Sequence, residues 1–194
     1  MNKLIISAAL AASLGAASAA NAQSVPAATV AVVDLEKVTT ECTACKAAAA
    51  SLRSQITGLQ TREQTLSGPL QTEQKSIQTA IDALSGKEPD AALQARAKAW
   101  ETKRQQAAQE IGRQQDQIKR NQAYITQQIQ TKLGPIYQQV MQKRGANLMV
   151  EIGSTLATSA SLDVSNDVLA SLNAALPSVQ TTAPATAQQQ PQGR

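Results

Sequence analysis

The sequence contains no histidine and no phenylalanine, and its 194 residues include only one tryptophan and two tyrosines. The lack of histidine excludes Ser-His-Asp and Cys-His catalysis and histidine-ligated zinc sites. The scarcity of aromatic rings argues against a large globular core and against stacking platforms for nucleic-acid bases. These absences favour a protein that is not an enzyme, needs no metal or cofactor, and binds no nucleic acid.

Long apolar runs are also scarce, and the most apolar one lies at the N-terminus. Lys3 is followed by an alanine-rich apolar run, residues 4–20, which ends in the Ala-Asn-Ala pattern of residues 20–22. This arrangement predicts a signal peptide, residues 1–22, cleaved after Ala22, and therefore export to the periplasm. A membrane anchor is the less favoured alternative, because the run is short for a membrane-spanning helix.

The positive charge is concentrated in the middle of the chain. The formal net charge is +4, but residues 46–144 carry 15 Lys and Arg against 8 Asp and Glu, a net of +7. The remaining residues therefore carry −3. In an exported protein, such a basic segment favours acidic polypeptides or anionic lipid as partners.

Two heptad patterns separated by a turn occupy this basic segment. The first set of apolar positions comprises Leu52, Ile56, Leu59, Leu66, Leu70, Ile77 and Leu84. The second set comprises Leu93, Ala97, Trp100, Ala107, Ile111, Ile118, Ile125, Ile129 and Leu133. Residues 85–90, rich in Gly, Pro and Asp, separate them. A 3.5-residue repeat requires a partner helix, so residues 46–133 are predicted to form an antiparallel coiled-coil arm with its tip at 85–90.

Residues on both sides of the arm are predicted to form one small head. Its first part is residues 23–45, with a buried strand at 29–34, where the sequence is TVAVVD. Its second part, residues 134–176, begins at Gly134-Pro135 and is predicted to hold a β-hairpin at 147–158 and a helix at 165–175 capped by Ser165. The fold class is therefore α+β, mainly α.

The small sheet and the C-terminal segment each allow one further prediction. So small a sheet buries little surface, which favours oligomerisation. The segment 177–194 is rich in Pro, Thr, Ala and Gln and has no apolar period. This composition predicts a disordered tail.

Cys42 and Cys45 form a C-x-x-C motif at the expected start of the first long helix. In an oxidising compartment this motif occurs in thiol-disulfide oxidoreductases, where a helix N-terminus lowers the pKa of the attacking thiol. The flanking residues lack the usual Trp-Cys-Gly-Pro pattern, and no βαβ unit follows. A structural disulfide or two packed thiols is the favoured interpretation, and an oxidoreductase remains the alternative.

Several segments together resemble the Skp/OmpH family of periplasmic chaperones. They are VAVVDLEKV at 30–38, the Ala-rich start of the first helix, and ANLMVEIGSTLATSASLDVSNDVLASLN at 146–173. The resemblance implies a homotrimer whose β heads associate and whose three arms enclose a cavity. It also implies that unfolded outer-membrane proteins are held there without ATP, and that lipopolysaccharide is a further partner.

On this resemblance, the client-binding surface is the inner side of the arm, 46–133, with no single contact residue identified. The trimer interface is expected at the head strands, through Val30, Val32, Leu148, Val150 and Ile152. An envelope adaptor that binds one folded partner through its coiled coil remains an alternative function.

The heptads also predict a register and a hinge in the arm. If Leu84 faces Leu93, the charged seam residues Glu73 and Arg104 meet and fix the register. In the same register, Gly68 and Pro69 lie near the level of Gly112. Both helices would then be weakened at one height, which predicts a hinge.

Overall fold

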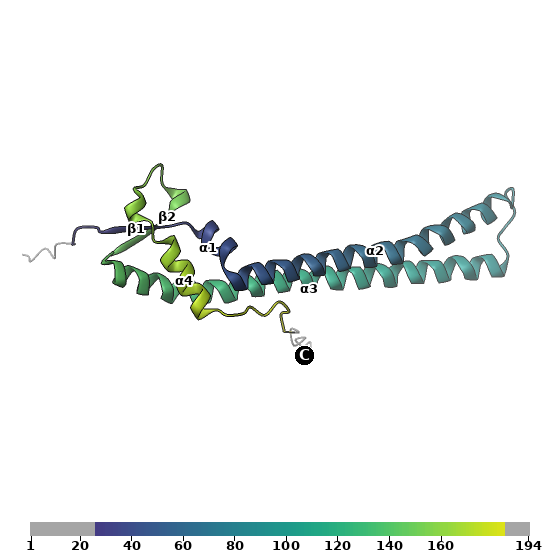
Figure 1. Cartoon of the computed structure of the whole chain (residues 1–194). Helices are drawn as coiled ribbons and strands as arrows, with labels where there is room; N and C mark the ends of the chain where they lie inside the picture. The colour runs from purple at the N-terminus through teal and green to yellow at the C-terminus, as the bar shows by residue number, and fades with distance from the viewer. Residues whose placement is uncertain (1–25, 185–194) are drawn as a thin grey trace, which may run out of the picture.

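The computed structural model describes residues 26–184 and shows a small head from which one long helical hairpin projects (Figure 1). The predicted fold class, α+β and mainly α, is confirmed. The predicted signal peptide, 1–22, and the last part of the predicted tail, 185–194, lie outside the described residues.

The arm consists of α2 (Thr43–Asp82) and α3 (Ala91–Arg144), which run antiparallel. They are joined by a turn in which Ser85 and Gly86 have positive φ angles of 50° and 89°. The side chain of Asp90 then caps α3 by accepting a hydrogen bond from the Leu93 amide at 2.8 Å.

Burial divides the arm into two parts. We call residues 43–56 and 117–144 the arm base, and residues 57–82 and 91–116 the outer arm. In α3 the buried residues all lie in the arm base: Asn121, Ile125, Ile129, Leu133, Ile136 and Val140. In the outer arm only Ile77 is buried. Elsewhere in the outer arm the leucines of the seam are half-buried, because each helix has a single partner.

No helix among residues 26–184 combines the length and the apolar character that a membrane span requires.

The prediction that the arm ends at Gly134-Pro135 is wrong, because α3 continues through both residues to Arg144. Gly and Pro cost about 1 and 3 kcal/mol relative to Ala inside a helix. The flanking apolar side chains of Leu133, Ile136 and Val140 are at most 5 % exposed. Their burial against the head offsets this cost.

The sheet of the head has two parallel strands, β1 (Val30–Val33) and β2 (Leu148–Glu151), with Val30 opposite Leu148. Parallel strands need a long crossover connection, and the whole arm serves as that connection (Figure 1). On its other side β1 makes a single bridge, between Val32 and Asp163.

The predicted β-hairpin at 147–158 is also wrong. β2 ends at Glu151 and is followed by 3-10 helices at Ile152–Ser154 and Ala160–Leu162. The hydroxyls of Ser154 and Thr155 donate to the carbonyls of Glu151 and Ile152, at 2.7 and 2.8 Å. These local hydrogen bonds stabilise a turn in place of a second strand.

Two short helices complete the head: α1 (Leu35–Glu41), which the sequence reading missed, and α4 (Ser165–Ala175). We expected Ser165 to be the N-cap of α4, but it is the first helical residue, and Val164 is the cap. The Asp163 carboxylate accepts hydrogen bonds from the Ser165 amide and hydroxyl at 2.8 and 2.5 Å. These bonds lower the pKa of Asp163. Val38 of α1 and Leu172 of α4 are fully buried in the core.

The first part of the predicted disordered tail is instead ordered against the arm. Val179 packs against the head core, and the main chain of Gln180 and of Ala183 is hydrogen-bonded to side chains of α3. From Val179 the chain runs beside the arm base (Figure 1, yellow). The composition of residues 177–184 gave no indication of the side chains on α2 and α3 that hold them.

Candidate functional site

Within the part of the chain that the structure describes, most of the positively charged side chains of the arm are not in ion pairs. Arg62 pairs with Glu110 at 2.6 Å across the two helices, and Glu101 pairs with Arg104 at 2.7 Å within α3. Hydrogen bonds from the two arginines lower the pKa of Glu110 and of Glu101. Ten arm cations have no carboxylate partner among the described residues: Lys46, Arg53, Lys75, Lys87, Lys98, Lys103, Arg113, Arg120, Lys132 and Lys143.

The predicted pair of Glu73 with Arg104 does not form. Glu73 is instead bound by Arg96, whose Nε and Nη2 donate to its two oxygens at 2.5 and 3.1 Å. Arg104 stays on its own helix, bound to Glu101, with its guanidinium 5.8 Å from the centre of the Trp100 ring.

Trp100 lies between these two arginines along α3, one turn from each. Its indole nitrogen donates to the carbonyl of Leu70 on α2 at 2.9 Å. Arg96, one turn before Trp100, then reaches Glu73. Arg104, one turn after Trp100, is held by the ring through a cation–π contact. Of the two arginines that flank Trp100, Arg96 therefore crosses to α2 and Arg104 does not.

Beside the predicted hinge, an open groove lies between the two helices. Pro69 and Leu66 line it on α2, and Lys103, Ala107 and Glu110 are among the residues that line it on α3. Gly112 is not among these residues. α2 continues through Pro69 as one helix, and toward the tip it curves away from α3 (Figure 1). The hinge itself stays a prediction.

A disulfide joins Cys42 and Cys45 at the corner between α1 and α2. The Cys42 amide donates to the Val38 carbonyl at 3.1 Å, and the Cys45 amide donates to the Cys42 sulfur at 3.2 Å. Cys42 is fully buried and Cys45 is 6 % exposed. The disulfide is therefore a buried link at the junction of α1 in the head and α2 in the arm.

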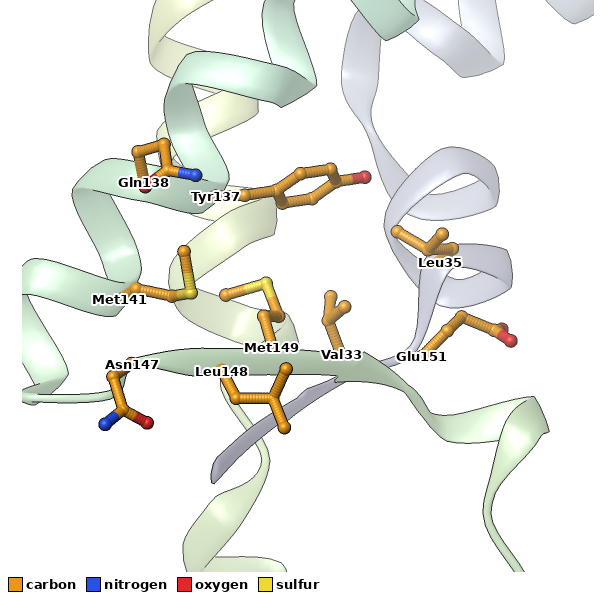
Figure 2. Close-up of a pocket in the computed structure, with 9 residues that line it drawn as sticks. All are labelled: Val33, Leu35, Tyr137, Gln138, Met141, Asn147, Leu148, Met149 and Glu151. Carbon is orange, nitrogen blue, oxygen red and sulfur yellow. The ribbon is translucent and has the colours of Figure 1, made fainter. Parts of the chain in front are cut away.

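A shallow apolar pocket lies between the end of α3 and the sheet. Figure 2 shows Tyr137 and Met141 of α3 on the same side of β2 as Met149 and Val33, with Leu35 of α1 closing one end. Partial burial raises the pKa of the Tyr137 hydroxyl. The lining has little polar character, so the pocket suits an apolar side chain of another polypeptide.

The five residues predicted for the trimer interface differ in exposure. Val32 is only 2 % exposed and is buried within the chain's own head, where its carbonyl accepts a hydrogen bond from the Val164 amide at 2.9 Å. It is therefore not available to another subunit. Val30, Val150 and Ile152 are half-buried, and Leu148 is 46 % exposed. Figure 2 shows the Leu148 side chain on the other face of β2 from Met149, although Leu148 also borders the pocket.

The sequence reading missed a row of amide side chains at the arm base. Gln117, Asn121 and Gln128 lie on one face of α3, and Gln55 lies opposite on α2; all four contact the tail or one another. The only signal in the sequence was the spacing of these residues on α3, which places them along one side of a helix. Because glutamine and asparagine are usually solvated, this signal is weak.

Comparison with known proteins agrees with this architecture. A crystal structure of a proposed outer membrane chaperone (OmpH-like) from Caulobacter crescentus CB15 superposes with a TM-score of 0.69 at 17 % sequence identity. The match covers 86 % of this chain and 96 % of that chain, which establishes a shared fold. No curated protein matches the sequence. The model of the family described as outer membrane protein (OmpH-like) matches residues 29–172. The chain therefore belongs to the OmpH-like family.

Proposed function

We propose that this protein is an ATP-independent periplasmic holdase chaperone, which shields unfolded outer-membrane proteins from aggregation between the arms of a homotrimer. The observation that carries the proposal is the long, basic, two-helix arm of an OmpH-like chain. The outer part of the arm has a single buried residue and therefore almost no hydrophobic core of its own. It offers surface to another molecule.

The chemistry of the arm surface suits many weak contacts. An unfolded outer-membrane protein exposes apolar strands that would otherwise pair with one another. The half-buried leucines of the seam and the exposed side chain of Ile56 (40 % exposed) offer apolar contacts. The unpaired cations attract acidic segments or anionic lipid over a distance that salt shortens.

The head supports the trimeric part of the proposal. Within the described residues β2 pairs only with β1, so its other edge is open. Open edges pair readily with strands of other chains. Leu148 on β2 is 46 % exposed, and Leu156 in the following loop is fully exposed. An interface that covers these leucines would remove apolar surface that a single chain leaves in water.

The disulfide is assigned a structural role. In an oxidoreductase the attacking thiolate has to reach a disulfide of the substrate. Cys42 has no exposed surface, and both cysteines belong to the core of the head. A bond that fixes the angle between α1 and α2 accounts for this position without redox chemistry.

The test is suppression of aggregation of a urea-denatured outer-membrane β-barrel protein after dilution, with the mass of the chaperone measured by light scattering. The expected results are a trimer, full protection without ATP, and weaker protection at high salt. A monomer at micromolar concentration, or protection that requires ATP, would contradict the proposal. Formation of a one-to-one complex with a single folded envelope protein, without protection, would instead indicate an adaptor.

A further inference from the structure

The row of amides at the arm base binds the protein's own tail through main-chain groups. We call Gln55, Gln117, Asn121 and Gln128 the amide strip. Gln128 makes two hydrogen bonds to the main chain of Gln180: its oxygen accepts from the amide at 3.0 Å, and its nitrogen donates to the carbonyl at 2.9 Å. This is the pairing that a neighbouring β-strand would offer.

The same two-point contact recurs three residues further along the tail. The Ala183 amide donates to Asn121 Oδ1 at 2.8 Å, and the Ala183 carbonyl accepts from Gln117 Nε2 at 3.3 Å. Between them, the Thr181 carbonyl accepts from Gln55 Nε2 at 3.2 Å. A side-chain amide carries both a donor and an acceptor, as a peptide group does. The strip therefore satisfies both polar groups of a passing main chain.

The strip is also held in place by its own hydrogen bonds. Asn121 is 3 % exposed, and its Nδ2 donates to Gln55 Oε1 at 2.7 Å across the two helices. Its Oδ1 also accepts from Gln117 Nε2 at 2.7 Å. Side chains that are already oriented lose less rotamer freedom when a chain binds.

Beyond the packing of Val179 on the head core, the tail's own side chains make few of the hydrogen bonds in this contact. The exceptions are the Gln180 side chain, which accepts from the Tyr124 hydroxyl at 3.1 Å, and the Thr181 hydroxyl, which accepts from Ser51 at 3.0 Å. A site that contacts mainly main-chain groups does not select one sequence, because every polypeptide carries those groups. This is the property that a chaperone for many unfolded clients needs.

We propose that the amide strip binds an extended segment of an unfolded client through its main chain, and that the tail occupies the strip when no client is bound. This inference rests on the proposed holdase function and names one client-binding site for it. The tail is tethered, so it competes at a high effective concentration. A client can bind only while the tail is away from the strip. Its apparent affinity is therefore its intrinsic affinity multiplied by the fraction of time that the strip is free of the tail.

Two variants separate the strip from the tail. Truncation after Val179 removes the competing residues but keeps the side chains of Leu176 and Val179 that pack on the head. Gln128→Met keeps the length of the side chain and removes both hydrogen bonds to Gln180. Gln122→Met is the matched control, because Gln122 is exposed on α3 and its side chain makes no hydrogen bond among the described residues.

The probes are a denatured outer-membrane β-barrel protein and a fluorescent peptide of residues 177–184, whose binding is measured by anisotropy. Truncation should tighten client binding, by about tenfold for a tail that occupies the strip about nine tenths of the time. Gln128→Met in the truncated protein should weaken the binding of both probes, and Gln122→Met should not. Methylation of the peptide nitrogens at Gln180 and Ala183 should weaken peptide binding by about tenfold.

The full-length protein is the reference that separates the two proposals. If it suppresses aggregation, but truncation and Gln128→Met leave client affinity unchanged, the strip proposal alone is overturned. If the full-length protein does not protect a client at all, the holdase proposal fails, and the strip proposal with it. Equal binding of the methylated and unmethylated peptides would overturn main-chain recognition.

Discussion

The arm base and the outer arm are parts of the same two helices, but different interactions hold them together. At the arm base, α3 has six buried residues, and α4 and the tail pack beside it. The outer arm has one buried residue, Ile77, and ion pairs such as Arg62–Glu110 on its surface. Exposed ion pairs contribute little to stability because water and salt screen them.

We infer from this difference that the arm base contributes most of the stability and that the outer arm is the part that can change shape. Buried apolar contacts resist opening, whereas segments with few of them open at low free-energy cost. For the proposed holdase, we therefore expect the outer arm to bend around clients of different sizes without unfolding the head. The predictions below test this contrast, from the largest expected effect to the smallest.

Two equivalent leucine truncations should have very different effects. Leu172 of α4 is fully buried in the head core, and Leu70 in the outer arm is only half-buried. Leu172→Ala should lower the free energy of unfolding by about 2–5 kcal/mol, because it leaves a cavity. Leu70→Ala should cost roughly 1 kcal/mol or less. Urea unfolding at one protein concentration measures both, and equal losses would contradict the contrast.

Replacing Gly68 and Pro69 by Ala should stiffen the outer arm. In a helix interior Gly and Pro are less favourable than Ala by about 1 and 3 kcal/mol, and a Cβ added at Gly68 meets no atom within 4 Å. We expect slower hydrogen exchange in the outer arm, a narrower distribution of tip-to-head distances, and a smaller range of client sizes. Gly58→Ala, also unobstructed, is the control away from Pro69.

An unchanged distance distribution in the Gly68→Ala, Pro69→Ala protein would dispose of the hinge. A change of similar size in Gly58→Ala would show that general helix propensity, and not the Gly68-Pro69 step, sets the flexibility of the arm.

Reduction of the disulfide should destabilise the head without abolishing the holdase activity. A bond that closes a loop of this length contributes about 2 kcal/mol through the entropy of the unfolded chain. Urea unfolding of the wild type with and without a reducing agent should show this loss. The Cys42→Ala, Cys45→Ala protein should be insensitive to the reducing agent and should still protect clients. Loss of protection in a folded double variant would favour the oxidoreductase.

The arm could be predicted from the sequence because its signals are local. The 3.5-residue repeat and the Gly-Pro-Asp turn both depend only on residues that are close in the sequence. The repeat also extends over many residues, which makes its signal strong. The head was predicted less well, because its strands are paired across the whole arm. The hairpin prediction failed where the hydroxyls of Ser154 and Thr155 bind nearby carbonyls, a local competition that alternation of apolar residues does not reveal.

The order of the tail on the amide strip could not be predicted from the composition of the tail. A stretch rich in Pro, Thr and Gln predicts disorder when nothing is known of its surroundings. Here the ordering groups are on α3, more than 50 residues earlier in the chain. Only the tertiary structure brings Gln128 and Gln180 together, so the tail could not be assigned from its own sequence.

The smallest expected effect concerns the ion-pair partner of Glu73. Hydrogen bonds from Arg96 lower the pKa of Glu73 below the usual carboxyl value. A lowered pKa in the folded state means that the pair adds stability above the unfolded pKa and loses it as the pH falls through the folded value. A double-mutant cycle of Glu73→Gln with Arg96→Gln should give a small coupling energy that vanishes at low pH and at high salt. The cycle of Glu73→Gln with Arg104→Gln should give none. Coupling to Arg104 and not to Arg96 would contradict this pairing and support the one that the heptads predicted, with Glu73 and Arg104 facing each other across the seam.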